Sequence, residues 1–598
     1  MIRRNHALAA LVAGLLVVTG VGAAGQAGAQ PGVPGVDRQA AALLRGMSLE
    51  EKVGQLFVAD VWGKSADQAD PGNRTKYGVD TPAQVVERYH PGGVIYFNNA
   101  GTDNVDDPVQ VAKLSNGLQR AALSSGARLP LIVSIDQEGG RVTRIAAPAT
   151  EYPANMAVGA GRSAEDARRL AAINGHELRA MGINQDFAPD ADVNSNPLNP
   201  IIGSRSFSAD PALTGELVAA EVEGYQDAGP ATQTVSSAAK HFPGHGDAAT
   251  DSHTGLPVIS RTEQQWRQID LPPFQAAIKS GIDVIMTAHI TVPSLDPSGE
   301  PATLSKPIMT GILRNELGYQ GVVVTDSLQM AGVRQLHPDS EIPVLALEAG
   351  VDQMLMPPDL GVAINGVLDA VRSGRLTEQR IDQSVLRILE LKIKRGILAK
   401  PLVNERAVNR TVGTPEHLAA IQQLTDRTTT VLRNDAGLLP LKNPGRILVA
   451  GWNNPSYPGY PAEPVATLAK ELGGTAVSTG ASPTASQIDE AVSAAQRSDT
   501  VVVLTNGLRT STAQQDLVRS LLATGKPVVA VTVQEPYDPG YADVPTWVAT
   551  YDWRDVTMRS LAMVLLGKIS PQGKLPVSIP AGSDGRTVLY PFGTGLTW

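Results

Sequence analysis

The stretch Gly321-Val322-Val323-Val324-Thr325-Asp326 is a run of β-branched residues that ends on a carboxylate. Three consecutive valines favour a strand that is buried on both faces. Seven further short apolar runs occur before residue 360, at spacings too long for hairpins. These runs are 55–59, 93–97, 131–135, 183–188, 236–239, 284–288 and 353–356. The pattern therefore predicts a set of parallel strands.

Helix-like stretches separate most of these runs. Residues 163–181 begin with Ser163-Ala164-Glu165-Asp166, which fits a capping box, and continue with alanine, leucine and arginine. Alternation of strands with helices predicts an α/β protein whose first domain is a (β/α)8 barrel resembling the TIM barrel. A long helix over 377–395, followed by Gly396 as its C-terminal stop, is expected to pack on this barrel.

The pattern changes from about residue 400, where a second, smaller α/β sandwich domain with a mostly parallel sheet is predicted. Its β-rich runs are 446–451, 500–504, 528–533 and 547–551. The predicted organisation is a signal peptide over 1–29, a catalytic barrel over 30–399, a linker with one helix over 400–434 and the C-terminal domain over 435–598.

The N-terminal segment predicts secretion into the extracellular or cell-wall space. Met1-Ile2-Arg3-Arg4 precedes an apolar run from Ala7 to Ala24, and Ala27-Gly28-Ala29 is a small-x-small cleavage signal. The alternative is an uncleaved anchor, because the apolar run nearly reaches the about 20 residues that cross a bilayer. No other segment is long and apolar enough to span, so no membrane span is expected after cleavage.

Composition narrows the possible chemistry. Fifty Lys and Arg against 59 Asp and Glu give a formal charge of −9, which offers no basic excess for binding nucleic acid. The chain has no Cys, which excludes disulfides, thiolate nucleophiles, Cys-ligated zinc and a lipid anchor on cysteine. Any chemistry must use histidine, carboxylates, hydroxyls or lysine.

Polar residues follow most of the predicted barrel strands. They are Asn98, Asp136, Asp190, Lys240 with His241, His289 and Asp326. Barrel enzymes build their sites at the C-terminal ends of the strands. We therefore expect a pocket lined by carboxylates and imidazoles.

The loop after the fifth strand, residues 240–257, is the most informative segment. It reads KHFPGHGDAATDSHTGLP and holds three of the nine histidines. One interpretation is a metal site, another a structurally ordered loop, and the third acid/base catalysis. The possible metal ligands are His241, His245, Asp247, Asp251 and His253.

Acid/base catalysis is the preferred interpretation of this loop. Asp251 lies two residues from His253, so its carboxylate can orient one imidazole nitrogen and leave the other free to exchange a proton. Asp326, at the end of its strand, supplies a candidate nucleophile. These are the elements of retaining glycoside hydrolysis, with histidine in place of the usual second carboxylate.

At this level of detail the chain resembles glycoside hydrolase family 3, and within it the β-N-acetylhexosaminidases that act on peptidoglycan fragments. The motifs that carry the resemblance are Asp136-Gln137-Glu138-Gly139-Gly140-Arg141-Val142 with Arg144, Phe187-Ala188-Pro189 through Asp192-Val193-Asn194, Ile202 to Phe207, Lys240 to His253, Met286 to His289 and Thr325-Asp326. They cover most of residues 45–395. Asp190 departs from the family pattern, in which an apolar residue is common. It is expected either to support the binding residues from behind or to be a solvated loop residue, and the second interpretation is preferred.

The resemblance implies a role for each site residue. Asp326 would be the nucleophile and the Asp251–His253 pair a mobile acid/base, while the N-acetylglucosamine (GlcNAc) hydroxyls and acetamide would be bound by Asp136, Arg144, Arg205, Lys240 and His241. No metal or other cofactor is implied. β-Glucosidases of this family take their acid/base from a Glu of the C-terminal domain, and Glu535 is the best-placed candidate here. The complete loop pair argues against that use of Glu535, so the second domain is expected to be structural or to shape the entrance.

The function expected from this resemblance is that of a secreted, retaining exo-β-N-acetylglucosaminidase. Its carbohydrate substrate would be a GlcNAc-containing muropeptide or a chitooligosaccharide. The alternatives are a family 3 β-glucosidase-like enzyme, a phosphorolytic glycosidase, a metal-dependent hydrolase that uses the histidine cluster, and a catalytically idle wall-binding protein.

Overall fold

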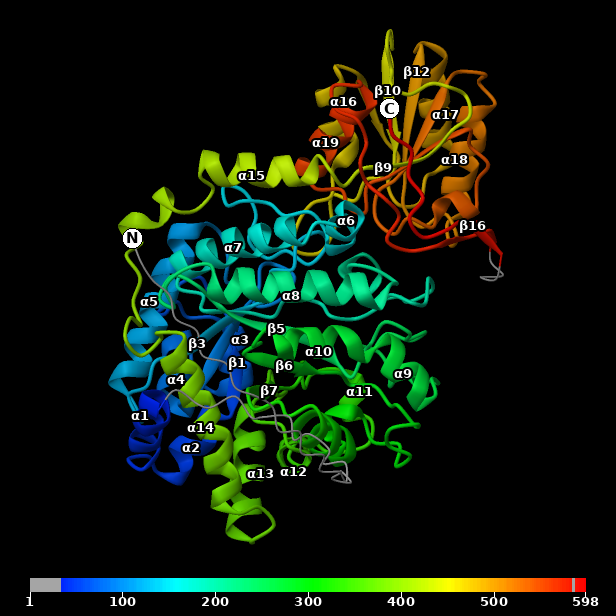
Figure 1. Cartoon of the computed structure of the whole chain (residues 1–598). Helices are drawn as coiled ribbons and strands as arrows, with labels where there is room; N and C mark the ends of the chain where they lie inside the picture. The colour runs from blue at the N-terminus through cyan, green and yellow to red at the C-terminus, as the bar shows by residue number, and fades with distance from the viewer. Residues whose placement is uncertain (1–33, 583–586) are drawn as a thin grey trace, which may run out of the picture. The chain divides into compact units, whose positions relative to one another are not determined.

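The computed structural model describes residues 34–582 and 587–598 (Figure 1). The predicted signal peptide, 1–29, lies outside these residues. No helix of the described ranges is long and apolar enough to cross a membrane.

Eight parallel strands form the sheet of the first domain, in the order β7-β6-β5-β4-β3-β2-β1-β8. They are β1 (Phe57–Asp60), β2 (Gly93–Tyr96), β3 (Ile132–Ile135), β4 (Gln185–Asp186), β5 (Ser236–Phe242), β6 (Val284–Thr287), β7 (Val322–Val324) and β8 (Met354–Leu355). A parallel bridge between Val324 and Gln353 joins β7 to the start of β8. The sheet is thereby closed into a barrel, as the sequence predicts.

Helices precede and follow the strands, and most of them cover the outside of this barrel (Figure 1). They are α1 (Pro34–Leu44), α2 (Leu49–Gln55), α3 (Pro71–Tyr77), α4 (Pro82–Tyr89), α5 (Pro108–Ser124), α6 (Asn155–Gly161), α7 (Ala164–Ala180), α8 (Pro211–Asp227), α9 (Glu263–Ile269), α10 (Leu271–Lys279), the π-helix η3 (Pro307–Glu316), α11 (Ala331–Arg334), α12 (Ile342–Ala349), α13 (Leu360–Arg372) and α14 (Glu378–Lys394). Ser163 is the N-cap of α7, since its hydroxyl accepts from the Asp166 N–H, which is one of the two hydrogen bonds of the predicted capping box. Helix α14 ends as expected before Gly396, which has a φ of 61°.

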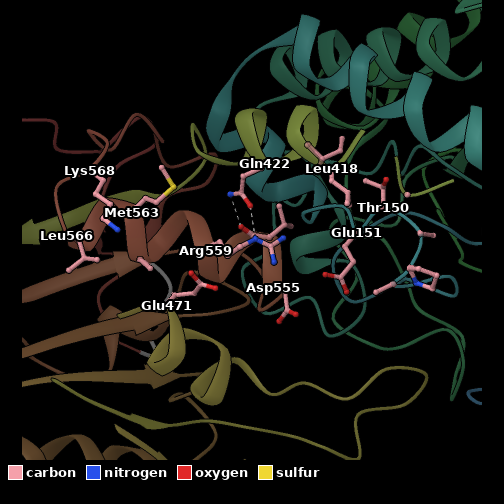
Figure 2. A pocket seen from close by; sticks show the side chains of 17 residues that line it. Thr150, Glu151, Leu418, Gln422, Glu471, Asp555, Arg559, Met563, Leu566 and Lys568 are labelled. Carbon is pink, nitrogen blue, oxygen red and sulfur yellow. Dashed lines mark hydrogen bonds between the residues drawn. The ribbon is translucent and has the colours of Figure 1, made fainter. Parts of the chain in front are cut away.

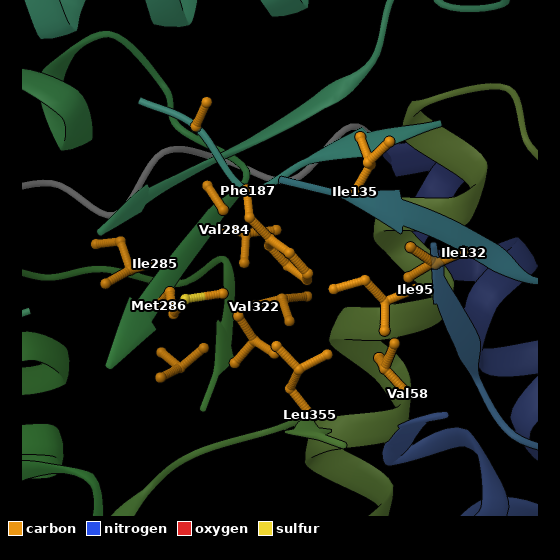
Figure 3. Packing of buried hydrophobic residues seen from close by; sticks show 14 of the residues in the cluster. Val58, Ile95, Ile132, Ile135, Phe187, Val284, Ile285, Met286, Val322 and Leu355 are labelled. Atoms are coloured by element: carbon orange, nitrogen blue, oxygen red, sulfur yellow. The ribbon is translucent and has the colours of Figure 1, made fainter. Parts of the chain in front are cut away.

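The barrel interior is packed with branched side chains from successive strands (Figure 3). Ile95, Phe187, Val284 and Leu355 point inward from four different places around the barrel and are at most 3% exposed. Burial of each such side chain contributes about 1.5–3 kcal/mol to folding. The barrel interior is therefore a packed hydrophobic core.

The second domain has a six-stranded sheet in the order β11-β10-β12-β13-β14-β9, in which only β9 is antiparallel to its neighbour. Its strands are β9 (Thr430–Asn434), β10 (Ile447–Gly451), β11 (Thr475–Ser478), β12 (Thr500–Thr505), β13 (Val528–Thr532) and β14 (Thr546–Ala549). The helices of this region are α15 (Pro415–Thr425), α16 (Pro464–Leu472), α17 (Ala485–Gln496), α18 (Thr512–Leu522) and α19 (Asp555–Leu565), and β15 (Ile579–Pro580) pairs with β16 (Val588–Tyr590).

Alternating side chains along β12 explain why this domain is a sandwich. Val501 and Val503 join a cluster with Leu517 of α18, whereas Val502 and Leu504 join a cluster on the opposite face. The second cluster is completed by α16 and α19. Since both faces of the sheet are apolar, both must be covered by helices.

Strand β9 lies inside the segment 400–434 that the sequence analysis assigns to a linker. It pairs with β14 through Val431 and Val548, so the second sheet begins before residue 435. The short run Thr430–Asn434 has too few apolar residues to be recognised without its partner strand. The other domain boundaries stay predictions.

Lys392 on α14 is a buried amine that pairs with no carboxylate of residues 34–582 and 587–598. Its Nζ donates to Gln55 Oε1 at 2.7 Å, and burial lowers the pKa of Lys392 to about 7. The unfolded chain keeps the proton of Lys392 up to a pH near 10.5, whereas the folded chain releases it above about pH 7. The destabilisation of the folded state by Lys392 is therefore greatest below about pH 7 and disappears as the pH rises towards 10.5.

Replacement of Lys392 by methionine is therefore expected to raise the free energy of unfolding by about 3 kcal/mol near neutral pH and much less near pH 10. Urea unfolding followed at several pH values measures the difference. Lys279→Met, at an exposed position on α10, controls for the added apolar side chain. A stabilisation that does not change with pH would contradict the assignment of a depressed pKa to Lys392.

Candidate active site

A cavity of about 510 Å³ lies at the C-terminal ends of the barrel strands. Ile95, Met286 and Leu355 form its apolar floor. Seven of the predicted site residues line it, namely Asp136, Arg144, Arg205, Lys240, His241, His253 and Asp326. The eighth, Asp251, is hydrogen-bonded to the lining residue His253. The structure thus brings all the predicted site residues together.

Asp326 lies two residues after the end of β7 and faces this cavity. Its Oδ1 accepts a hydrogen bond from the Ser327 N–H at 2.7 Å, and its Oδ2 lies 4.0 Å from His241 Nε2. Burial raises the pKa of Asp326, but its neighbours His241, His289 and His253 and the Ser327 N–H outweigh burial and hold the pKa below its ordinary value. Asp326 is therefore a carboxylate with one oxygen free to react.

His289 fixes the segment that carries Asp326. Its Nε2 lies 3.0 Å from the Ser327 carbonyl oxygen and its Nδ1 lies 2.8 Å from the Thr303 hydroxyl. The carbonyl can only accept, so Nε2 carries a proton, while the Thr303 hydroxyl also donates to the Ala288 carbonyl at 3.0 Å. Burial lowers the pKa of His289 below its ordinary value.

The Asp251–His253 pair lies on the loop after β5. Asp251 Oδ1 accepts both the His253 backbone N–H at 2.9 Å and its Nδ1–H at 2.7 Å. Burial raises the pKa of Asp251, but these two hydrogen bonds lower it below its ordinary value. The His253 side chain is 56% exposed, so its Nε2 can reach both the cavity and solvent.

Lys240, Asp136 and Arg144 form a polar wall of the cavity. Lys240 Nζ lies 2.8 Å from Asp136 Oδ1, and Arg144 Nη2 lies 3.8 Å from Asp136 Oδ2. Burial lowers the pKa of Lys240, but Asp136 and Glu138 outweigh it and raise the pKa above its ordinary value. A carboxylate between two cations accepts hydrogen bonds, while the cations only donate, which suits adjacent sugar hydroxyls.

Glu138 was not predicted as a site residue, yet it holds this wall together. Its two oxygens accept a bidentate pair from Arg205 at 2.9 Å each, and Oε1 is 2.6 Å from Lys240 Nζ. Burial raises its pKa, but Arg205 and Lys240 lower it well below the ordinary range. Both oxygens of Glu138 are bound by cations and the side chain stays ionised, so Glu138 positions Arg205 and Lys240.

Asp192, also not predicted, fixes two histidines of the loop after β5. Its Oδ2 accepts from His241 Nδ1 at 2.7 Å and its Oδ1 from the His245 N–H at 2.6 Å. Arg205 Nη2 can only donate and lies 3.3 Å from His241 Nε2, so Nε2 accepts and Nδ1 carries the proton. Burial lowers the pKa of His245 to about 4, and its Nε2 pairs with Ser252, which gives His245 a structural role.

Asp190 is completely buried, so its prediction as a solvated loop residue is wrong. The strand-like bridge between Asp190 and Lys240 carries it into the barrel wall. Its Oδ2 has no hydrogen-bond partner within the described part of the chain and lies 3.8 Å from Arg205 Nη2. Burial and the neighbouring Asp192 raise the pKa of Asp190 well above its ordinary value.

One group of described residues is compact enough to hold a metal ion, formed by Asp190, Asp192 and His241. The Nδ1–H of His241 is donated to Asp192, and the guanidinium of Arg205 lies beside Asp190. These contacts are those of an ion-pair network, and a divalent cation there would face the positive charge of Arg205. The five candidate ligands of the predicted metal alternative are instead divided among separate contacts, with Asp247 pairing to Arg261.

The C-terminal domain contributes Tyr457 to the cavity. The Tyr457 ring meets Trp553 edge-on at 4.7 Å between centroids, and the Gly459 carbonyl of the same loop accepts from Asn98 Nδ2 at 2.8 Å. Glu535 lies outside the cavity lining and accepts from Ser204 N–H and Oγ at 3.3 Å each. The second domain thus helps to shape the entrance, while Glu535 binds a barrel loop.

A larger cavity, of about 940 Å³, lies elsewhere, between residues 147–151, α15 and α19 (Figure 2). Arg559 crosses it and donates to Gln422 Oε1 at 2.9 Å. Its lining is mostly apolar and includes the carboxylates of Glu151, Glu471 and Asp555, but no histidine among the residues that the structure describes. None of the residues that the sequence motifs indicate lines this cavity, so the smaller cavity is the candidate active site.

Comparison with known proteins identifies the two domains. The model of the glycosyl hydrolase family 3 N-terminal domain matches residues 48–391, and that of the family 3 C-terminal domain matches residues 429–598. A β-hexosaminidase A from Pseudoalteromonas piscicida is 40% identical over 434 residues, which is 67% of this chain and 70% of that protein.

Two further relatives cover more of the chain. A β-N-acetylglucosaminidase/β-glucosidase from Cellulomonas fimi is 29% identical over 77% of this chain and 86% of its own. The solved structure of a family 3 β-N-acetylglucosaminidase from Paenibacillus sp. str. FPU-7 is 36% identical and covers 90% of this chain and 99% of its own, with a TM-score of 0.81. The matched domains span both sheets and the whole cavity described above, and the chain belongs to glycoside hydrolase family 3.

Proposed function

We propose that this protein is a secreted, retaining exo-β-N-acetylglucosaminidase that releases terminal β-linked GlcNAc from peptidoglycan fragments. The observation that carries the proposal is the placement of Asp326 and His253 in one cavity, with Asp251 orienting the imidazole. The names of the relatives from Pseudoalteromonas piscicida and Paenibacillus support the activity on N-acetylhexosamines.

In the first step, a free oxygen of Asp326 attacks the anomeric carbon of the bound sugar. The bond to the leaving-group oxygen breaks as His253 Nε2–H protonates that oxygen, and a covalent glycosyl ester forms on Asp326. The imidazole is then neutral. Asp251 supports this cycle because its carboxylate holds Nδ1–H and stabilises the imidazolium form that donates the proton.

In the second step, neutral His253 takes a proton from water as the water attacks the same carbon. The ester bond breaks and Asp326 leaves as a carboxylate, so the product has the configuration of the substrate. Lys240, Arg205 and His241, held by Asp136, Glu138 and Asp192, keep the ring in place through both steps. The closed floor of Ile95, Met286 and Leu355 favours a chain end over an internal sugar.

Product analysis on two substrates tests the proposal. Incubation with GlcNAc-MurNAc-peptide and with GlcNAc-β-1,4-GlcNAc is expected to release terminal GlcNAc from both, without internal cleavage of longer chains, and faster from the muropeptide. Faster turnover of the chitin disaccharide would contradict the proposed natural substrate. Release of no sugar from any β-linked substrate would identify a catalytically idle wall-binding protein.

The same assay separates the remaining alternatives. Phosphorolysis is tested by adding inorganic phosphate to the assay, since neutral His253 carries no full negative charge to repel it. If GlcNAc 1-phosphate appears when phosphate is added, phosphate takes the place of water as the attacking group in the second step. Preference for a β-glucoside would favour the dual activity named for the Cellulomonas fimi relative. Loss of activity after dialysis against EDTA would favour the metal-dependent hydrolase.

The proposed secretion rests on the leader of residues 1–29, with its basic start, apolar run and Ala27-Gly28-Ala29. N-terminal sequencing of protein from the culture medium is expected to find a chain that starts after Ala29. Recovery of the full leader in the membrane fraction would show an anchored protein instead.

A further inference from the structure

Asp60, the last residue of β1, is a buried carboxylate at the cavity end of the barrel. Its Oδ1 lies 2.6 Å from Lys76 Nζ and accepts from the Tyr77 hydroxyl at 3.1 Å. Lys76 is itself almost buried, with its ammonium 5.8 Å from the Trp62 ring centre and 5.5 Å from that of Tyr77. The carboxylate of Asp60 is therefore held rigidly in an ion pair that is shielded from solvent.

The other oxygen of Asp60 fixes a side chain of the cavity. Gln329 lines the cavity three residues after Asp326, and its Nε2 donates to Asp60 Oδ2 at 3.2 Å. A carboxylate in an ion pair only accepts hydrogen bonds, so the amide NH2 of Gln329 must face it. The alternative orientation of the amide would place two acceptors against each other. Gln329 Oε1 is therefore directed away from Asp60.

We propose that Gln329 is a substrate-binding residue, whose Oε1 accepts a hydrogen bond from an O–H or N–H group of the bound glycoside, and that Asp60 and Lys76 are the positioning residues that set its orientation. This role deepens the proposed glycosidase function and rests on it. Neither Asp60 nor Gln329 is among the residues that the sequence motifs indicate.

The chemistry of the cavity gives this oxygen a purpose. The side chains that the motifs place there for sugar binding are mainly donors, namely Arg144, Arg205 and Lys240, and Asp136 is the acceptor partner of Arg144 and Lys240. A sugar hydroxyl or amide N–H on the β7 side also needs an acceptor when water is displaced. Gln329 Oε1 supplies one without adding a second negative charge beside Asp326.

Selective loss on substrate analogues tests the role. Gln329→Met keeps the length of the side chain and removes both amide groups. It is expected to lower kcat/KM for the aryl β-glycoside of GlcNAc about 10-fold. The panel consists of its 3-deoxy, 4-deoxy, 6-deoxy and N-methylacetamido forms, and a GlcNAc disaccharide. For the one analogue that lacks the group donated to Gln329 Oε1, Gln329→Met is expected to change kcat/KM hardly at all. A fall in kcat/KM confined to the disaccharide would place that donor group on the leaving-group sugar.

Asp60→Asn provides the second variant. Asparagine can present either oxygen or NH2 to Gln329, so the amide of Gln329 loses its fixed orientation. The kcat/KM of this variant should therefore fall on the same substrates as that of Gln329→Met and stay unchanged on the same analogue. Gln320→Met, at an exposed position before β7, is the matched control and should leave every rate unchanged. Thermal unfolding of each variant shows that the fold is retained.

An equal loss on every analogue, or no loss on any, would overturn the proposal. The ratios are measured on whichever aryl β-glycoside the wild-type protein cleaves. Failure of the proposed GlcNAc specificity therefore appears in the wild-type rates, whereas failure of the role of Gln329 appears only in the variant ratios.

Discussion

Asp326→Ala is expected to abolish turnover, with a fall in kcat/KM of at least about 10⁴-fold on every substrate. The carboxylate forms the bond to the anomeric carbon, and no other described carboxylate of the cavity is free to replace it. Glu138 is held in ion pairs with Arg205 and Lys240, and Asp136 is held in an ion pair with Lys240. Initial rates on an aryl β-glycoside of GlcNAc measure the loss.

Azide provides a sharper readout of the same variant. A small anion can occupy the space left by the missing carboxylate and attack from the same face of the sugar. The product should then be the α-glycosyl azide, whereas the wild-type enzyme should give the β-configured sugar first. Asp339→Ala, which breaks an exposed ion pair with Arg334, is the control and should keep wild-type turnover. Rates in Asp326→Ala close to those of the control would refute the nucleophile assignment.

The barrel could be predicted from the sequence because each of its strands is a local signal. A run such as 321–325 is apolar, β-branched and bounded by turn residues, and its place in the sheet follows from the alternation with helices. The site residues that end strands or sit in the loop after β5 were predictable for the same reason. Asp326, Asp136 and Lys240 all come directly after or at the end of a strand.

The residues that hold the site together could not be found in this way. Glu138 and Asp192 stand inside the sequence motifs, but their tasks depend on partners distant in sequence. Arg205 lies 67 residues from Glu138, and His241 lies 49 residues from Asp192. A carboxylate that binds substrate and one that binds a neighbouring cation look alike in a sequence. Only the distances of the folded chain separate these roles.

Asp190 and β9 show how local reasoning fails. Asp190 is polar and follows a proline, which is typical of an exposed turn, yet the bridge to Lys240 buries it. Strand β9 has only two apolar residues, and its partner β14 lies more than a hundred residues later. In both cases a contact distant in sequence decides the structure, against the local composition.

His253→Ala is expected to affect substrates according to their leaving groups. A sugar leaving group needs a proton to depart, so kcat/KM for a muropeptide or a chitin disaccharide should fall about 10³-fold. An activated aryl leaving group departs without protonation, so its kcat/KM should fall only about 10-fold. Asp251→Asn should show the same pattern with smaller losses, because the imidazole remains but its Nδ1–H has lost the carboxylate that orients it.

The two steps of the reaction make a second outcome of His253→Ala measurable. With an activated substrate, the first step stays fast, but the second has lost its base, so the glycosyl ester on Asp326 should accumulate. A burst of aryl alcohol and a peptide around Asp326 that carries one N-acetylhexosamine, found by mass spectrometry, are the expected signs. His337→Ala is the matched control, since His337 also pairs with a carboxylate, that of Glu300, but lies outside the cavity lining. Equal losses of His253→Ala on sugar and aryl leaving groups would show that His253 is not the proton donor, because a donor acts only where the leaving group needs a proton.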